Sequence, residues 1–155
     1  LQKRRMDTFC ENEIKRFSDN WQVAECEKSL TCEFAGITLT GQIDRVDKRN
    51  DEIFVLDYKT GKYPIYNAKN FTEATDFQLE FYYLLAQNEG EVKSCGYYDL
   101  KSGKIVNEEL LEEKLELLYT HLQALRETKV FDFEQTDDIK ECRICPYTHL
   151  CGREL

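Results

Sequence analysis

The sequence predicts an α+β domain in which helices flank a central β-sheet, in the order helix, three strands, helix, strand. Apolar residues at helical spacing predict the helices, alternating β-branched and aromatic runs predict the strands, and turn residues separate them. The helices are expected at 2–20, 76–89 and 108–127, and the strands at 23–34, 38–48, 53–59, 91–100 and 104–106.

The first helix is expected to be amphipathic. Its apolar residues recur at helical spacing, which predicts one buried stripe. The stripe consists of Met6, Cys10, Ile14, Phe17 and Trp21. The strand at 23–34 then turns at Ala35-Gly36 into the next strand, so three consecutive strands form a meander.

The second and third strands are predicted to form a tight hairpin around Asn50-Asp51, since both residues tolerate the positive φ of a two-residue loop. With the loop centred there, paired residues have numbers that add up to 101, so Asp44 lies opposite Asp57 on one face of the ribbon. Lys59 points to the same face. Two adjacent carboxylates repel each other, and a divalent cation would remove that repulsion. Two acids, a metal and a lysine indicate a site for phosphodiester hydrolysis.

Arg45 and Asp47 lie on the opposite face of this ribbon by strand parity, so we expect them to form a structural pair and not to join the site. The alternative reading of the hairpin is a solvated, charged ribbon, with Lys59 as an exposed strand lysine.

The later elements carry their own boundary signals. Gly90 ends the helix that begins near Asp76, and a loop at 63–75 leads directly out of the strand that carries Lys59. The last helix has a leucine stripe, with Asn107 as its expected cap. The stripe consists of Leu111, Leu115, Leu118, Leu122 and Leu125.

The composition is that of a globular protein: of 155 residues, 41% are hydrophobic and 12% aromatic. The net charge of −9 is unusual for a protein that grips DNA, so we expect much of the DNA-holding surface to belong to other parts of a longer parent. The chain opens on Leu1 within a helical pattern, as a piece of a longer chain would. No apolar run has the length of a membrane span. Seven cysteines without a secretory signal favour a cytoplasmic protein that uses thiols for metal.

Four motifs in order resemble the RecB/AddB branch of the PD-(D/E)XK nuclease superfamily. They are GQIDRVD from Gly41, VLDYKTG ending at Gly61, QLEFY from Gln78 to Tyr82, and the cysteines of CRICPYTHLC. The resemblance implies a restriction-endonuclease-like core with a mixed central sheet. It also implies a nuclease core at 1–130 and a cysteine-rich segment at 131–155 that packs on it.

The resemblance assigns roles to individual residues. Asp44, Asp57 and the backbone carbonyl of Tyr58 would bind Mg²⁺ or Mn²⁺, and Lys59 would position the attacking water and stabilise charge on the phosphate. Relatives usually add a histidine or glutamate from upstream, for which Glu13, Glu25 and Glu27 are the candidates.

Gln78 and Tyr82 are four residues apart on one helix face, and they would line the site or contact DNA phosphates. The alternative for this pair is a polar helix edge beside a buried tyrosine.

Cys142, Cys145 and Cys151 resemble the C-terminal cysteines of the iron–sulfur members of this branch. A 4Fe–4S cluster needs a fourth thiolate, which relatives take from upstream. Cys10, Cys26, Cys32 and a residue outside this chain are the candidates, so we expect the cluster to be incomplete or absent here. Zinc with His149 as fourth ligand is the alternative.

The resemblance implies a metal-dependent DNA nuclease, an exonuclease rather than an endonuclease. It would act on single-stranded ends supplied by a partner helicase in double-strand break repair. A stand-alone CRISPR-type nuclease and a catalytically silent DNA-holding or interaction module are the alternatives.

Overall fold

A computed structural model describes residues 2–130, 134–137, 139–143 and 145–152. The elements follow the predicted order. The helices are α1 (Gln2–Ser18), α2 (Gln78–Ala86), α3 (Leu111–Glu127) and the single turn α4 (Ile139–Cys142), with short 3₁₀ turns at Phe71–Glu73 and Gln87–Glu89. The strands are β1 (Gln22–Phe34), β2 (Ile37–Arg49), β3 (Glu52–Lys59), β4 (Glu91–Asp99) and β5 (Lys104–Asn107).

The five strands form one mixed sheet in the order β1-β2-β3-β4-β5. β1, β2 and β3 make the predicted antiparallel meander, β4 runs parallel to β3, and β5 returns antiparallel to β4. The parallel pair requires a crossover, and α2 supplies it. The predicted α+β class with a mixed central sheet is therefore confirmed.

The β2–β3 hairpin has the predicted register. Its pairs run from Arg49↔Glu52 to Arg45↔Leu56, so paired numbers add up to 101, and Asn50 has the positive φ of 55° that the turn requires. The β2–β3 pairing ends at Arg45↔Leu56, so the predicted pairing of Asp44 with Asp57 is not part of the ladder.

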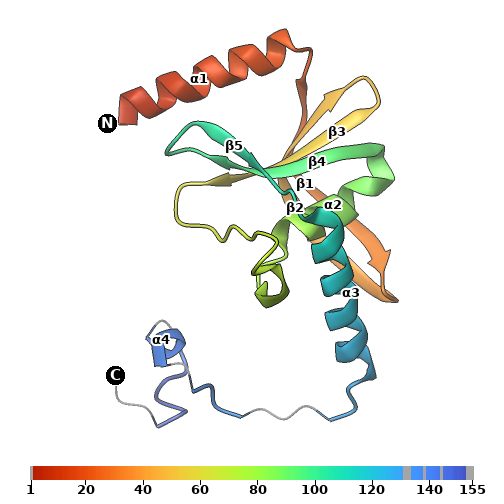
Figure 1. The fold of residues 1–155 in the computed structure, drawn as a ribbon, viewed down its shortest axis with the longest axis vertical. Helices are drawn as coiled ribbons and strands as arrows, with labels where there is room; N and C mark the ends of the chain where they lie inside the picture. The colour runs from red at the N-terminus through yellow and green to blue at the C-terminus, as the bar shows by residue number, and fades with distance from the viewer. Residues whose placement is uncertain (1, 131–133, 138, 144, 153–155) are drawn as a thin grey trace. The chain divides into compact units, whose positions relative to one another are not determined.

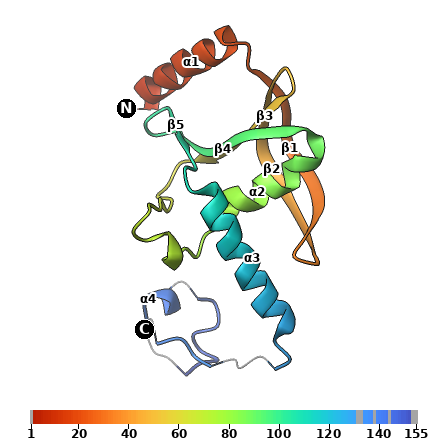
Figure 2. The ribbon, with the colours of Figure 1, turned by 45° about the vertical axis from the view of Figure 1, so that its right-hand side comes forward.

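Helices cover both faces of the sheet (Figures 1 and 2). On one face, alternate residues of β3 such as Ile53 and Val55 meet Leu79 and Leu85 of α2 in the main core. On the other face, Phe54 and Leu56 form a second cluster with Trp21 and Tyr98, against which Phe9 of α1 packs. α3 adds a third cluster through Leu118, next to Leu84 of α2.

The predicted buried stripe of α1 is wrong. Met6, Ile14 and Phe17 are 53%, 65% and 49% exposed and Cys10 is also exposed, so only Trp21, beyond the helix end, is buried as expected.

α1 meets the sheet through a different side. The rings of Phe9 and Tyr98 pack in a tilted arrangement with their centroids 4.9 Å apart. Glu13 and Arg16 form ion pairs with charged residues of β2. The buried charges on that face of the sheet need polar partners, and they outweigh the apolar stripe in setting the orientation of the helix.

α3 begins three residues later than predicted, at Leu111, because Asn107 is the last residue of β5 and does not cap the helix. Glu108 instead accepts the backbone N–H of Leu110 at 3.0 Å, just before the first turn. Leu118 is buried, whereas Leu125 near the end of the stripe is 52% exposed.

The chain divides into two compact units, residues 1–125 and 126–155. The packing of the cysteine-rich segment on the nuclease core stays a prediction. Among the described residues, no helix is long and apolar enough to cross a membrane.

Candidate active site

Asp57 occupies the centre of the candidate site, near the end of β3. Its side chain is buried, and Oδ1 accepts a hydrogen bond of 2.6 Å from Nε2 of Gln78. Oδ2 lies 2.8 Å from Nζ of Lys59, yet it is a buried atom with no well-oriented hydrogen bond. Burial raises the pKa of this carboxyl, the charge of Asp44 raises it further, and Lys59 opposes both. The site therefore holds an under-satisfied carboxylate oxygen.

Asp44 lies where β2 leaves β3. Asp44 is the β2 residue next to Arg45, where the β2–β3 pairing ends. Its Oδ2 accepts a hydrogen bond of 3.0 Å from the backbone N–H of Tyr58. Ile43 and Val46 both belong to the core on the α2 side, so β2 does not alternate regularly between them. On β1, Glu27 has a φ of 51° between the pairs that flank Asp44. The irregular stretch of β2 therefore contains Asp44, whose side chain binds the backbone of β3.

Lys59 lies between Asp57 and helix α2. Its Nζ donates to Oε1 of Gln78 at 2.6 Å, contacts Asp57, and lies 5.1 Å from the ring centroid of Tyr97. Its side chain is 23% exposed, so the ammonium group is held in place but remains accessible.

Gln78 and Tyr82 come from α2, and the structure places both beside Asp57. The first-turn residue Gln78 accepts from Lys59 through Oε1 and donates through Nε2 to Asp57 and, at 3.2 Å, to the hydroxyl of Tyr82. Burial raises the pKa of Tyr82 to about 12, so its hydroxyl stays protonated at neutral pH. Gln78 thus connects the acid and the lysine.

The oxygen atoms at the end of β3 fit a hard divalent cation. The carbonyl of Lys59 accepts the N–H of Leu100, the residue after β4, so strand alternation directs the Tyr58 carbonyl toward β2, where Asp44 binds the N–H of the same residue. Two carboxylates and one carbonyl are ligands that Mg²⁺ and Mn²⁺ prefer. Oδ2 of Asp57, which contacts Lys59 but has no well-oriented hydrogen bond, has the capacity to accept such an ion.

The upstream glutamates do not complete this ligand set. Glu13 pairs at 2.7 Å with Arg45, whereas exposed Glu25 lies 3.4 Å from Lys28, and Glu27 is exposed. Within the described part of the chain, no three His, Cys, Asp or Glu side chains form a group that could hold a metal.

Asp47 lies outside the site, as strand parity predicts. Both of its oxygens bind the Arg45 guanidinium, at 2.6 and 2.8 Å, and Arg16 adds a third contact at 2.7 Å. The sequence predicts the Arg45–Asp47 pair but not the contacts that Glu13 and Arg16 make with it. Phe9, Glu13 and Arg16 are four and three residues apart on α1, and this helical spacing was the signal that could have identified the face of α1 that meets the sheet.

A second buried charge cluster was also missed. Nζ of Lys114 on α3 lies 2.8 Å from both Glu80 on α2 and Glu108, and Lys114 and Glu80 are almost inaccessible to solvent. Burial raises the pKa of Glu80, an effect that Lys114 opposes. The available signal was a glutamate within the otherwise apolar helix QLEFYYLLA.

The three C-terminal cysteines lie in a short, turn-rich segment. Cys142 ends α4 and is buried, its carbonyl accepts the N–H of Cys145 at 3.2 Å, and Cys151 is exposed. The carbonyl of Cys151 accepts a hydrogen bond from Gln135 at 3.1 Å. Of the proposed upstream partners, Cys10 and Cys26 are exposed and Cys32 is partly buried.

Comparisons with known proteins bear on this arrangement. A family model described as the PD-(D/E)XK nuclease superfamily matches residues 1–152. A solved structure titled "Crystal structure of SSO0001" is similar with 15% identity, covering 97% of this chain and 69% of that one, at a TM-score of 0.38. No curated protein matches the chain.

Proposed function

Because the chain belongs to the PD-(D/E)XK nuclease superfamily, we propose that its site hydrolyses phosphodiester bonds in DNA with Mg²⁺ or Mn²⁺ as cofactor. The observation that carries the proposal is the buried Asp57 carboxylate, one oxygen of which lacks a well-oriented hydrogen bond, beside Asp44 and Lys59. Asp44, Asp57 and the carbonyl of Tyr58 would hold the ion, which supplies Lewis-acid chemistry at the phosphate.

The other residues act on the substrate and on one another. Lys59 places a positive charge where the phosphate gains negative charge, and it orients the attacking water. Gln78 fixes the Lys59 ammonium and the Asp57 carboxylate through one amide, at 2.6 Å each. Tyr82 supports Gln78 and, as a protonated hydroxyl, can donate to a phosphate oxygen.

The order of the motifs from Gly41 to Cys151 supports a narrower role, an exonuclease of the RecB/AddB type that acts in the cytoplasm on single-stranded ends. A helicase subunit or domain would deliver these ends during double-strand break repair. The net charge of −9 supports such a partnership, since DNA has to be held by basic surfaces elsewhere.

The test is cleavage of labelled single- and double-stranded DNA with Mg²⁺ or Mn²⁺. Asp57→Ala and Asp44→Ala should abolish cleavage and keep the fold, and Lys59→Ala should lower the rate by about 10²–10³-fold. Asp51→Ala, in the exposed turn of the same hairpin, is the matched control. Cleavage by Asp57→Ala at the wild-type rate, in the same metal, would show that the site is wrongly assigned.

The cysteines support a second cofactor, a 4Fe–4S cluster bound in the parent protein by Cys142, Cys145, Cys151 and one further thiolate. Iron and sulfide analysis of this chain and of a longer one tests the proposal. We expect about four irons per chain only where the fourth thiolate is present. Stoichiometric zinc in both chains would contradict it and favour His149 as ligand.

A further inference from the structure

A pocket of about 400 Å³ opens beside the candidate active site, within the size range of small-molecule sites. Three segments form its walls: the loop after β3, strand β5, and the connection from β5 to α3. The lining residues from these segments are Pro64, Ile65, Tyr66, Ile105, Val106, Asn107, Glu108 and Glu109, and Leu79 and Tyr97 complete the lining.

Two lining residues connect the pocket to the site. Tyr97 is the partner of Asp57 in the β3–β4 ladder, and its ring centroid is 5.1 Å from Nζ of Lys59. Leu79 directly follows Gln78 on α2. A DNA strand whose phosphate lies against Asp57 and Lys59 therefore has an adjacent nucleotide within reach of this pocket.

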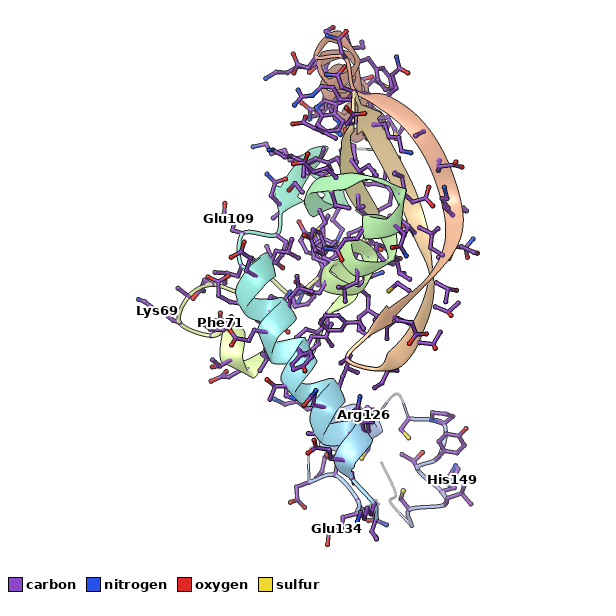
Figure 3. The ribbon with its side chains drawn as sticks, turned by 90° about the vertical axis from the view of Figure 1, so that its right-hand side faces the viewer. Lys69, Phe71, Glu109, Arg126, Glu134 and His149 are labelled. Atoms are coloured by element: carbon purple, nitrogen blue, oxygen red, sulfur yellow. The ribbon has the colours of Figure 1, made fainter. Side chains whose placement is uncertain are left out.

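The chemistry of the lining favours a neutral, flat group with N–H donors. Tyr66 and Tyr97 supply aromatic surface, and Ile65 and Val106 add apolar contacts. Asn107 and Glu109 contribute polar acceptors, whereas both carboxylate oxygens of Glu108 already bind Leu110 and Lys114. Figure 3 shows Glu109 just before α3, with its side chain directed away from the helix. The carboxylate of Glu109 and the amide oxygen of Asn107 at the same wall disfavour a phosphate group and favour an exocyclic amino group.

Lys114 contacts two walls of the pocket from the protein interior. It binds Glu108 of the pocket wall and Glu80 of α2, each at 2.8 Å, and its Nζ lies 5.1 Å from the ring centroid of Tyr66. Lys114 is itself 2% exposed, so the loop, α2 and α3 are joined at one buried charge. The hydroxyl of Tyr66 accepts the N–H of Thr75 at 3.1 Å, which fixes the ring from its other end.

We propose that this pocket binds one unpaired nucleobase of the strand being cleaved, next to the phosphate at Asp57, and favours bases with an exocyclic amino group over thymine. The proposal rests on the proposed nuclease function. A base within a duplex has its faces stacked and its pairing edge occupied, so the pocket would also give a preference for single strands. Tyr66 and Tyr97 act by aromatic contact, Asn107 and Glu109 act by hydrogen bonding, and Glu108 stays bound to Lys114.

The test uses labelled single-stranded DNA with one abasic site placed at successive positions. Cleavage in Mg²⁺ should fall by about tenfold when the abasic site reaches the pocket position, the range for loss of one stacked base. Thymine at that position should be worse than adenine or cytosine by about tenfold. Fluorescence anisotropy of the same series in EDTA measures binding without cleavage.

Pocket variants identify the residues. Val106→Trp fills the pocket from β5 and should make cleavage of intact and abasic strands equal. Ile65→Ala should weaken the base-dependent effect, whereas Ile14→Ala, an isoleucine of similar exposure on α1 (65% against 62%), should not.

The two proposals fail in different ways. A wild-type protein that cuts no DNA refutes the nuclease function, while the anisotropy series still reports on the pocket. Cleavage and binding that are indifferent to the position of the abasic site overturn the base pocket, even if cleavage is robust. An equal loss in Val106→Trp and Ile14→Ala would also overturn it.

Discussion

Replacing Asp57 by asparagine should stabilise the metal-free protein at neutral pH while it abolishes cleavage. The side chain is 2% exposed, and burial is the main reason that its pKa lies above 3.8. The amide keeps an oxygen for the Gln78 donor and removes the buried charge. Because Oδ2 is paired with Lys59 at 2.8 Å but has no well-oriented hydrogen bond, its desolvation is only partly compensated, and relief of such a group is worth about 1–3 kcal/mol.

The pH dependence of this difference follows from the direction of the pKa shift. A carboxyl whose pKa is raised on folding binds its proton more tightly in the folded state. Its contribution to stability is fully present below about pH 3.8 and is lost as the pH rises through the folded-state pKa. Wild type and Asp57→Asn should therefore have similar stability in acid, and the variant should gain its advantage on the way to neutral pH.

Mg²⁺ should reverse the order of the two proteins. An ion that binds only the folded wild type adds about 2.7 kcal/mol at a hundred times its Kd, and the variant lacks the charged ligand. Urea unfolding followed through Trp21, the single and buried tryptophan, measures this in EDTA and in Mg²⁺. Asp51→Asn is the control. A variant less stable than wild type in EDTA at neutral pH would refute the desolvation argument, and equal stabilisation of both by Mg²⁺ would refute Asp57 as a ligand.

Three further predictions concern the surroundings of the site. Gln78→Ala should lower the unfolding free energy by about 1–3 kcal/mol and reduce cleavage, because Asp57 loses its buried donor, whereas Gln87→Ala, at an exposed position just after the same helix, should do neither. Lys114→Met should cost about 3–5 kcal/mol in urea unfolding, since buried Glu80 and partly buried Glu108 lose their cation, and a loss below 1 kcal/mol would contradict the buried pairing. DNA binding by this chain, measured by anisotropy, should be weak and fall steeply with salt, and tight, salt-insensitive binding would contradict the view that partner surfaces hold the DNA.

The sequence was sufficient for the features that depend on local rules. The Asn50 turn sets the hairpin register, and strand alternation then separates Asp57 from Arg45 and Asp47 on the two faces. The four-residue spacing of α2 places Gln78 beside its tyrosine. Each of these follows from a short segment and its period, so tertiary packing had little freedom to change it.

The features that were missed depend on partners distant in the chain. The apolar stripe of α1 predicted the wrong buried face, because periodicity alone does not reveal that Arg45 and Asp47, about 30 residues downstream, need Glu13 and Arg16. The Lys114 cluster joins α2, α3 and the end of β5 in the same way. A buried charge can be recognised in a sequence only when its counter-charge is known.

The buried charges around Arg45 connect the α1 face of the sheet to the candidate active site on the α2 face. One nitrogen of the Arg45 guanidinium binds both Glu13 and, at 3.0 Å, the hydroxyl of Tyr58, while the backbone N–H of Tyr58 binds Asp44. Arg45 therefore holds the side chain of Tyr58 on the α1 face. The backbone carbonyl of the same tyrosine is the one proposed to bind the metal. Because β2 and β3 are no longer paired at this point, side chains replace the missing ladder bonds in setting the distance between Asp44 and Asp57. The charged residues of the GQIDRVD segment thus act on two faces of the sheet. Asp44 is the proposed metal ligand on one face, and Arg45 on the other face binds the side chain of Tyr58, whose backbone N–H binds Asp44.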